Sequence, residues 1–157
     1  MILVDANLLI YAVNRDAPLH EPARTWWQET LSGNRITGIP WVAALAFLRI
    51  TTSARIFPQP LHPDQAIDYL DSWLEQPVAQ LVSPGEQHWA ILRNLLRHTG
   101  MGGNLTTDAH IAALALERGH AVYSTDNDFK RFPGIHHVNP LALKHPNAVH
   151  EGISGYR

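Results

Sequence analysis

The sequence predicts an α/β fold built on a mainly parallel central sheet of four or five strands, with helices on both faces. Short apolar runs alternate along the chain with longer segments in which apolar residues recur at helical spacing. Prolines and glycines stand between these segments, where they would end one element and begin the next. The chain has 157 residues, which is the size of a single domain, and shows no internal repeat or linker. These observations together indicate one α/β domain, because strands that alternate with helices pair in parallel.

The chain opens with a continuous apolar run at residues 2–4, which indicates a buried first strand. A short helix is expected next, over residues 8–13. Pro18 then begins a longer helical segment, because its fixed backbone angle suits the first turn of a helix. That segment contains two adjacent tryptophans and ends near Gly33, where glycine and asparagine favour a turn.

The middle of the chain contains two further strand candidates, at residues 36–39 and 78–82. Two helices are expected between them. Pro40 begins the first, whose apolar side chains lie near helical spacing, and Pro63 begins the second, which runs to about Leu74. A proline-rich turn separates the two helices, because proline cannot continue the first of them.

The last third of the chain predicts two helices and two strands. Pro84 begins a helix that ends in a glycine-rich segment. Thr106 or Thr107 can cap the following helix, which a glycine ends. Residues 121–124 form the fourth strand candidate and residues 135–138 the fifth.

The composition is that of an ordinary globular protein, with 45% hydrophobic and 17% charged residues. From residue 142 onward the chain is polar and loses its periodicity, so we expect a domain over residues 1–141 and a loose tail over residues 142–157. Cysteine is absent, which excludes disulfides, thiolate metal sites and cysteine nucleophiles. No apolar run approaches the roughly 20 residues of a membrane span, and we expect a cytoplasmic protein with no membrane partner.

The charge balance does not by itself favour nucleic-acid binding. The formal net charge is −2, from 12 Lys and Arg against 14 Asp and Glu. Proteins that neutralise phosphates usually carry a basic surplus. A nucleic-acid substrate would therefore need positive charge supplied locally, by bound metal ions and a few arginines.

Three aspartates occupy positions from which they can meet. Asp5 directly follows the first strand candidate, and Asp126 follows the fourth. Ligand sites of parallel sheets gather at the carboxyl ends of the strands. Asp108 lies in the first turn of a helix, and the residues three, four and seven positions beyond it are apolar. That face should pack on the sheet, which points the carboxylate of Asp108 toward the same strand ends.

Clustered carboxylates repel one another unless a cation lies among them. Oxygen ligands suit hard divalent ions, so the cluster predicts a Mg²⁺ or Mn²⁺ site. Each aspartate alone also has a structural explanation. Asp5 can be a helix cap, Asp108 can favour the helix dipole, and Asp126 and Asp128 can be turn residues. Their shared position at the strand ends is what favours a site.

Other residues that can carry chemistry form no comparable pattern. The ten histidines show no ligand spacing on a shared helix face, and His110 lies about 200° around its helix from Asp108. The five tryptophans all fall on expected helices, where we expect a core or dimer-interface role. Ser124 lacks a histidine partner, and there is no glycine loop of the phosphate-binding kind. A phospho-acceptor domain would need paired early acids, and Asp5 has no acidic neighbour.

Several motifs, in the right order, resemble those of PIN-domain proteins of the VapC toxin type. Residues 4–11, Val-Asp-Ala-Asn-Leu-Leu-Ile-Tyr, are similar to the opening motif of that family. Residues 103–115 and 124–132 are similar to its later acidic motifs, and residues 47–52 and 139–141 also match. The likeness therefore covers nearly the whole expected domain.

The resemblance implies a three-layer α/β/α sandwich, Mg²⁺-dependent endoribonuclease activity on RNA, a homodimer, and inhibition by a VapB-type antitoxin. Mn²⁺ is an expected substitute for Mg²⁺. Asp5, Asp108 and Asp126 match the first, third and fourth acids of the family's site, and the resemblance implies that they are catalytic residues and metal ligands. The residues expected to support them are Asn7, Thr125 and Asp128.

One position departs from the family pattern. The family's second acid is a glutamate directly before the Phe-Leu-Arg stretch, and this chain has Ala46 there. No acid occurs between Glu29 and Asp64. Three interpretations stay open: a weaker or missing metal, replacement of the ligand by Asp128, or a non-catalytic module that binds RNA or antitoxin.

Overall fold

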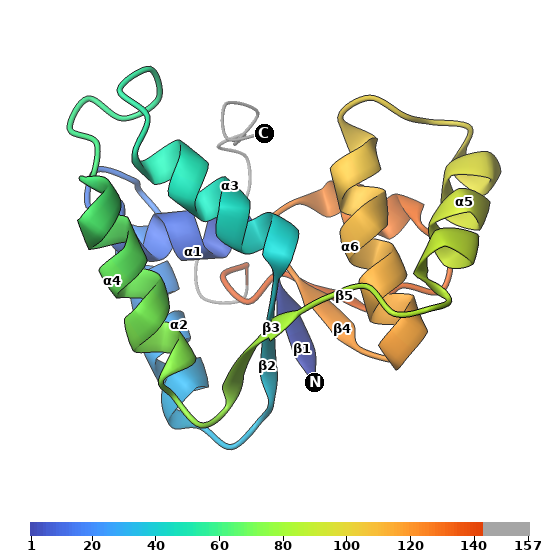
Figure 1. Ribbon diagram of the computed structural model, residues 1–157, viewed down its shortest axis with the longest axis horizontal. Helices are drawn as coiled ribbons and strands as arrows, with labels where there is room; N and C mark the ends of the chain where they lie inside the picture. Colours follow the sequence, from blue (N-terminus) through green and yellow to red (C-terminus); the bar gives the residue numbers. More distant parts are fainter. Residues whose placement is uncertain (143–157) are drawn as a thin grey trace.

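The computed structural model describes residues 1–142 and contains a sheet of five parallel strands in the order β3-β2-β1-β4-β5 (Figure 1). β1 lies at the centre and pairs with β2 on one side and β4 on the other. The strands are β1 Ile2–Val4, β2 Thr37–Pro40, β3 Ala79–Val82, β4 Ala121–Tyr123 and β5 His137–Val138. The parallel pairing confirms the predicted α/β class. The tail expected over residues 142–157 lies outside the described residues from residue 143 onward.

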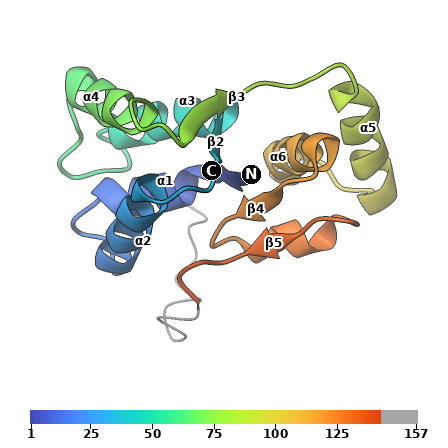
Figure 2. The same cartoon turned by 90° about the horizontal axis from the view of Figure 1, so that it is seen from below.

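Within the described part of the chain, six α-helices and one 3₁₀-helix cover the two faces of the sheet (Figure 2). Helices α1 to α4 pack on one face, and α5, α6 and η1 pack on the other. The helices are α1 Ala6–Val13, α2 His20–Ser32, α3 Trp41–Thr51, α4 Pro63–Leu74, α5 His88–Thr99, α6 Leu105–Arg118 and η1 Asn127–Arg131. This arrangement is the expected three-layer α/β/α sandwich. None of these helices is long and apolar enough to cross a membrane.

The central strand shows why the sheet is covered on both faces. Ile2 and Val4 belong to the hydrophobic core on the side of α1 to α4, whereas Leu3 belongs to the core beneath α5 and α6. All three side chains are at most 2% exposed. Successive side chains of a strand point to opposite faces, so a strand buried on both sides has to be continuously apolar. The apolar run at the start of the sequence is therefore the signature of a central strand.

The two helices on the second face begin at different residues than the sequence predicts. α5 begins at His88 and not at Pro84. The backbone N–H groups of Gly85 and Gln87 donate hydrogen bonds to the carboxylate of Glu117 (2.7 and 3.0 Å), and these bonds hold a turn before the helix. α6 begins before both threonines that were expected to cap it. Glu117 of α6, which is 30 or more positions away in the sequence, thus contributes to where α5 begins, and the local sequence does not show this contact.

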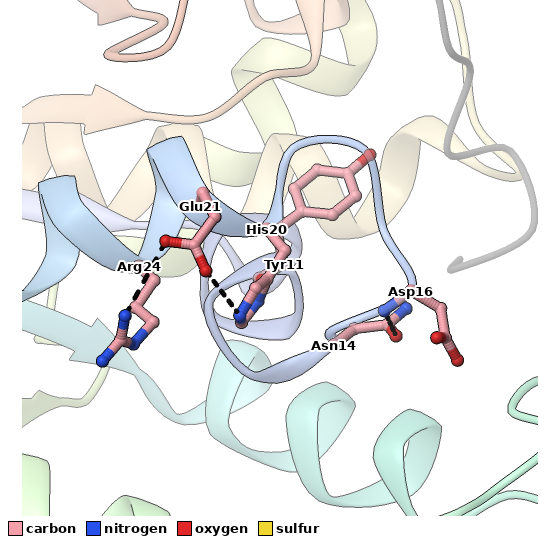
Figure 3. Close-up of polar contacts among 6 residues, drawn as sticks. All are labelled: Tyr11, Asn14, Asp16, His20, Glu21 and Arg24. Atoms are coloured by element: carbon pink, nitrogen blue, oxygen red, sulfur yellow. Dashed lines mark hydrogen bonds and ion pairs between the residues drawn. The ribbon is translucent and has the colours of Figure 1, made fainter.

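Polar contacts stabilise the turn between α1 and α2 (Figure 3). The side-chain oxygen of Asn14 accepts a hydrogen bond from the backbone N–H of Asp16 (3.2 Å). Nδ1 of His20 donates to the carbonyl oxygen of Tyr11 (2.9 Å), and Nε2 of the same ring lies 3.6 Å from the carboxylate of Glu21. These contacts fold α2 back along α1, the helix that carries the first residues of the candidate site.

The tryptophans divide between core and surface. Trp26, Trp27 and Trp73 are buried, and the rings of Trp27 and Trp73 meet edge to face with 5.6 Å between centroids. Trp41 and Trp89 are 48% and 64% exposed. The expected core role is thus confirmed for the first three.

Candidate functional site

The first element of the site is the junction between β1 and α1. Asp5 follows the last residue of β1 and caps α1, because its Oδ1 accepts a hydrogen bond from the N–H of Ala6 (2.8 Å). Its Oδ2 accepts a second bond, from the hydroxyl of Ser124 (2.7 Å). Asp5 is only 7% exposed. A helix cap does not require the second bond, so the carboxylate is oriented by the residues that follow both β1 and β4.

Ser124 connects three parts of the site through one hydroxyl group. Besides donating to Asp5, its Oγ accepts hydrogen bonds from Nδ2 of Asn7 (3.1 Å) and from the backbone N–H of Asp126 (3.0 Å). The side chain is fully buried. This linking role of Ser124 was not predicted from the sequence. The available signal was the parallel pairing of β1 with β4, which places the residues after the two strands side by side.

Three carboxylates gather near the carboxyl end of β4. Asp108, Asp126 and Asp128 each offer an oxygen, and these oxygens all lie within 4.8 Å of one another. Asp108 is 2% exposed in the first turn of α6, and Asp126 caps η1 by accepting a bond from the N–H of Asp128 (2.9 Å). Two of the three aspartates singled out in the sequence thus lie in one group. Asp5 is not a member of it, and Asp128 is the third member.

Two further oxygens suit a cation or its water ligands, on Asn7, which bonds to Ser124, and on Thr125, which directly precedes Asp126. Oδ1 of Asn7 and Oγ1 of Thr125 are buried and have no hydrogen-bond partner among the described residues. A buried polar atom without a partner is costly, so such atoms usually serve a ligand or a bound water. Carboxylate, amide and hydroxyl oxygens are the ligands that hard divalent cations prefer. The donor set therefore fits a hard divalent cation.

A cleft with a volume of about 490 Å³ opens beside the carboxylates. Its lining comes from the start of α1, from α3, and from the start of α6, and α3 and α6 stand on either side of the strand ends in Figure 1. Asp5 and Asp108 both line it, as do Ala46 and Arg49 of α3. The position of the missing acid thus faces the same space as the two aspartates.

The histidines near the site make structural contacts. Nδ1 of His110 lies 2.9 Å from Nε2 of His88 on α5, so His110 contacts the neighbouring helix, as its angle from Asp108 predicts. Nε2 of His137 donates to the carbonyl oxygen of Ser124 (2.9 Å), which supports the residue behind the carboxylates. Burial lowers the pKa of all three rings below the ordinary value of 6.5. Their neutral forms are therefore favoured in the folded protein.

The chain is similar to known proteins along nearly its whole length. A family model described as PIN domain matches residues 2–135. Ribonuclease VapC37 of Mycobacterium tuberculosis is 44% identical over 143 residues, which cover 91% of this chain and 99% of that protein. Ribonuclease VapC33 of the same organism is 41% identical over 141 residues, which cover 90% of this chain and 99% of that protein.

Solved structures share the fold at lower sequence identity. VapBC2 from Rickettsia felis, bound to a DNA fragment from its promoter, matches with a TM-score of 0.65 and 17% identity over 88% of this chain and 98% of that chain. VapBC-1 from nontypeable Haemophilus influenzae matches with a TM-score of 0.63 and 17% identity over 89% of this chain and 98% of that chain. At such identities the likeness supports the fold alone.

Proposed function

The chain belongs to the PIN-domain family, and we propose that it is an endoribonuclease that acts as the toxin of a toxin–antitoxin pair. Two relatives at 44% and 41% identity are ribonucleases by name, and this chain spans nearly all of each. The observation that carries the proposal is the group of Asp108, Asp126 and Asp128, whose oxygens lie within 4.8 Å of one another near an open cleft. Such a group is unfavourable without a cation, and it suits phosphodiester chemistry.

We assign Asp5, Asp108 and Asp126 as the catalytic carboxylates and metal ligands, with Asp128 as an added ligand and Asn7 and Thr125 in support. Mg²⁺ or Mn²⁺, when bound, would activate water for attack on a phosphodiester and offset the charge of the leaving oxygen. The chain's own residues prepare this site. Hydrogen bonds from Ala6 and Ser124 hold the two oxygens of Asp5, and the same serine holds the backbone of Asp126.

The proposed partners follow from the relatives. Two relatives at 44% and 41% identity are named VapC, and two of the solved structures that share the fold are VapBC assemblies; both support a VapB-type antitoxin as the inhibitor. We propose RNA as the substrate, a homodimer as the assembly and the cytoplasm as the location. The domain boundary is proposed at residue 141, with residues 142–157 as a tail.

The position of Ala46 supports a second candidate function. Ala46 lines the cleft and brings no carboxylate to α3. The alternative is therefore a module of the same fold that binds RNA or antitoxin and cleaves slowly or not at all. The two candidates differ in metal-stimulated turnover.

Cleavage of a structured RNA by the purified protein tests both. The proposed function predicts cleavage with Mg²⁺ or Mn²⁺ that stops on adding EDTA and falls by roughly 10²- to 10⁴-fold in Asp5→Asn. Asp68→Asn, which changes an exposed carboxylate on α4, is the matched control and should cleave like the parent. Equal cleavage by Asp5→Asn and the parent would assign the activity to a contaminant or another site. Activity seen only after Ala46→Glu would favour the binding module.

A further inference from the structure

The cleft beside the carboxylates is lined by two acidic side chains and one basic side chain. Among the described residues that line it, Asp5 and Asp108 are acidic and Arg49 of α3 is the only basic side chain. The backbone of RNA is a polyanion, so its approach to the two carboxylates is electrostatically unfavourable. The net charge of the chain, −2, does not offset this repulsion. A local cation is needed at the cleft itself.

Arg49 is exposed and available for a ligand. Within residues 1–142, no hydrogen bond or ion pair engages its guanidinium group. Two other exposed arginines are engaged: Arg131 lies 3.4 Å from the carboxylate of Asp128, and Arg24 lies 3.7 Å from that of Glu21. A guanidinium is permanently charged, and its planar fork of N–H groups matches two oxygens of a phosphate.

The residue one turn earlier explains why no acid of α3 pairs with Arg49. Ala46 precedes Arg49 at i,i+3 spacing, on the same face of α3, and lines the same cleft. The sequence contains no acid between Glu29 and Asp64, so α3 has no carboxylate that could pair with Arg49. An acid at position 46 would hold the guanidinium against the helix.

We infer that Arg49 is a substrate-binding residue, which holds a backbone phosphate of the RNA in the cleft, and that alanine at position 46 keeps it available. The inference rests on the proposed ribonuclease function. α3 thereby offers the cleft a cation and no carboxylate, and Asp5 and Asp108 line the same cleft. The aspartates then hold the metal, and Arg49 of α3 holds the RNA backbone.

Fluorescence anisotropy with a labelled single-stranded RNA and Mn²⁺ tests this role. All the proteins compared carry Asp5→Asn, so that the RNA is not cleaved during the measurement. Adding Arg49→Gln should weaken binding roughly tenfold and reduce the slope of log K against log salt by about 0.7, the share of one phosphate contact on a single strand. Arg49→Lys keeps the charge and should keep the slope. Arg93→Gln, an exposed arginine on α5 outside the cleft lining, is the matched control.

Kinetics and a second variant sharpen the test. With Asp5 intact, Arg49→Gln should raise KM roughly tenfold and change kcat by less than about twofold, as expected for lost substrate binding. Ala46→Glu should weaken RNA binding to a similar extent, and adding Arg49→Gln to it should cause little further loss. Unchanged affinity and salt slope in Arg49→Gln, or a fall in kcat at constant KM, would overturn the inference. A parent that binds RNA without cleaving it would refute the proposed activity alone.

Discussion

Removal of the Ser124 hydroxyl gives a strong test of the reasoning about the site. Ser124→Ala deletes one donor and one shared acceptor: Oγ donates to Asp5 at 2.7 Å and accepts from Asn7 at 3.1 Å and from the N–H of Asp126 at 3.0 Å. The side chain is fully buried, so water cannot readily replace it. A hydrogen bond to a charged group contributes about 1.5–3 kcal/mol and a neutral one about 0.5–1.5 kcal/mol.

We therefore expect Ser124→Ala to lower the free energy of unfolding by about 3 kcal/mol, measured by urea unfolding without metal. For a chain of this size that corresponds to a fall in Tm of about 6–12 °C. Ser72→Ala is the control, because the exposed hydroxyl of Ser72 donates to the carbonyl of Tyr69 and to nothing else in residues 1–142. Its loss should change the free energy of unfolding by less than about 0.5 kcal/mol.

The same variant should also disturb metal binding. Asp5 and the backbone of Asp126 both lose an orienting bond, and loss of such support typically weakens metal affinity by about 10–100-fold. Calorimetric titration with Mn²⁺ measures this change. A variant that unfolds within about 1 kcal/mol of the parent and binds Mn²⁺ equally well would refute the view that Ser124 organises the site.

Three other predictions follow from separate contacts. Arg131→Gln should tighten Mn²⁺ binding by about two- to fivefold, because an exposed ion pair worth about 0.2–1 kcal/mol no longer competes for Asp128. Arg24→Gln is the control, because Arg24 pairs with Glu21 on α2 and not with an aspartate of the site, and it should leave Mn²⁺ binding unchanged. Burial lowers the pKa of His88 and of His110 below 6.5, so the unfolded chain takes up protons at higher pH than the folded one. The stability that these neutral rings allow should be fully present above pH 6.5 and be lost as the pH falls from there through the lowered pKa values of the folded protein. In urea unfolding across this range, His88→Gln should lose stability less steeply with falling pH than the parent. An equal dependence of stability on pH in both proteins would contradict the lowered pKa of His88. Gly38→Ala should destabilise the fold by about 1–3 kcal/mol, because the added Cβ would lie 2.6 Å from Val82 and 2.7 Å from Leu3, while Gly33→Ala, whose Cβ meets ordinary contacts at 3.4 Å, should change the unfolding midpoint little.

Much of the fold could be predicted because its signals are local. The order of strands and helices follows from apolar periodicity and from proline and glycine, and α4 begins and ends at the predicted residues, Pro63 and Leu74. The apolar run at residues 2–4, which forms β1, predicts a strand buried on both faces, because each of its side chains enters one of the two cores and has to be apolar. The positions of the aspartates after strands and in a first turn are likewise visible in the sequence.

The way the site is assembled depends on contacts that the sequence alone does not show. Asp5 and Ser124 are 119 positions apart, and the pairing of β1 with β4 is what joins them. The same geometry places Asp128, expected as a supporting residue or as a replacement for the missing acid, within the carboxylate group and leaves Asp5 outside it. Composition and spacing thus specify which residues can carry the chemistry. Only the packed chain decides which atoms meet, because a hydrogen bond or a shared cation depends on positions defined to within a few tenths of an ångström.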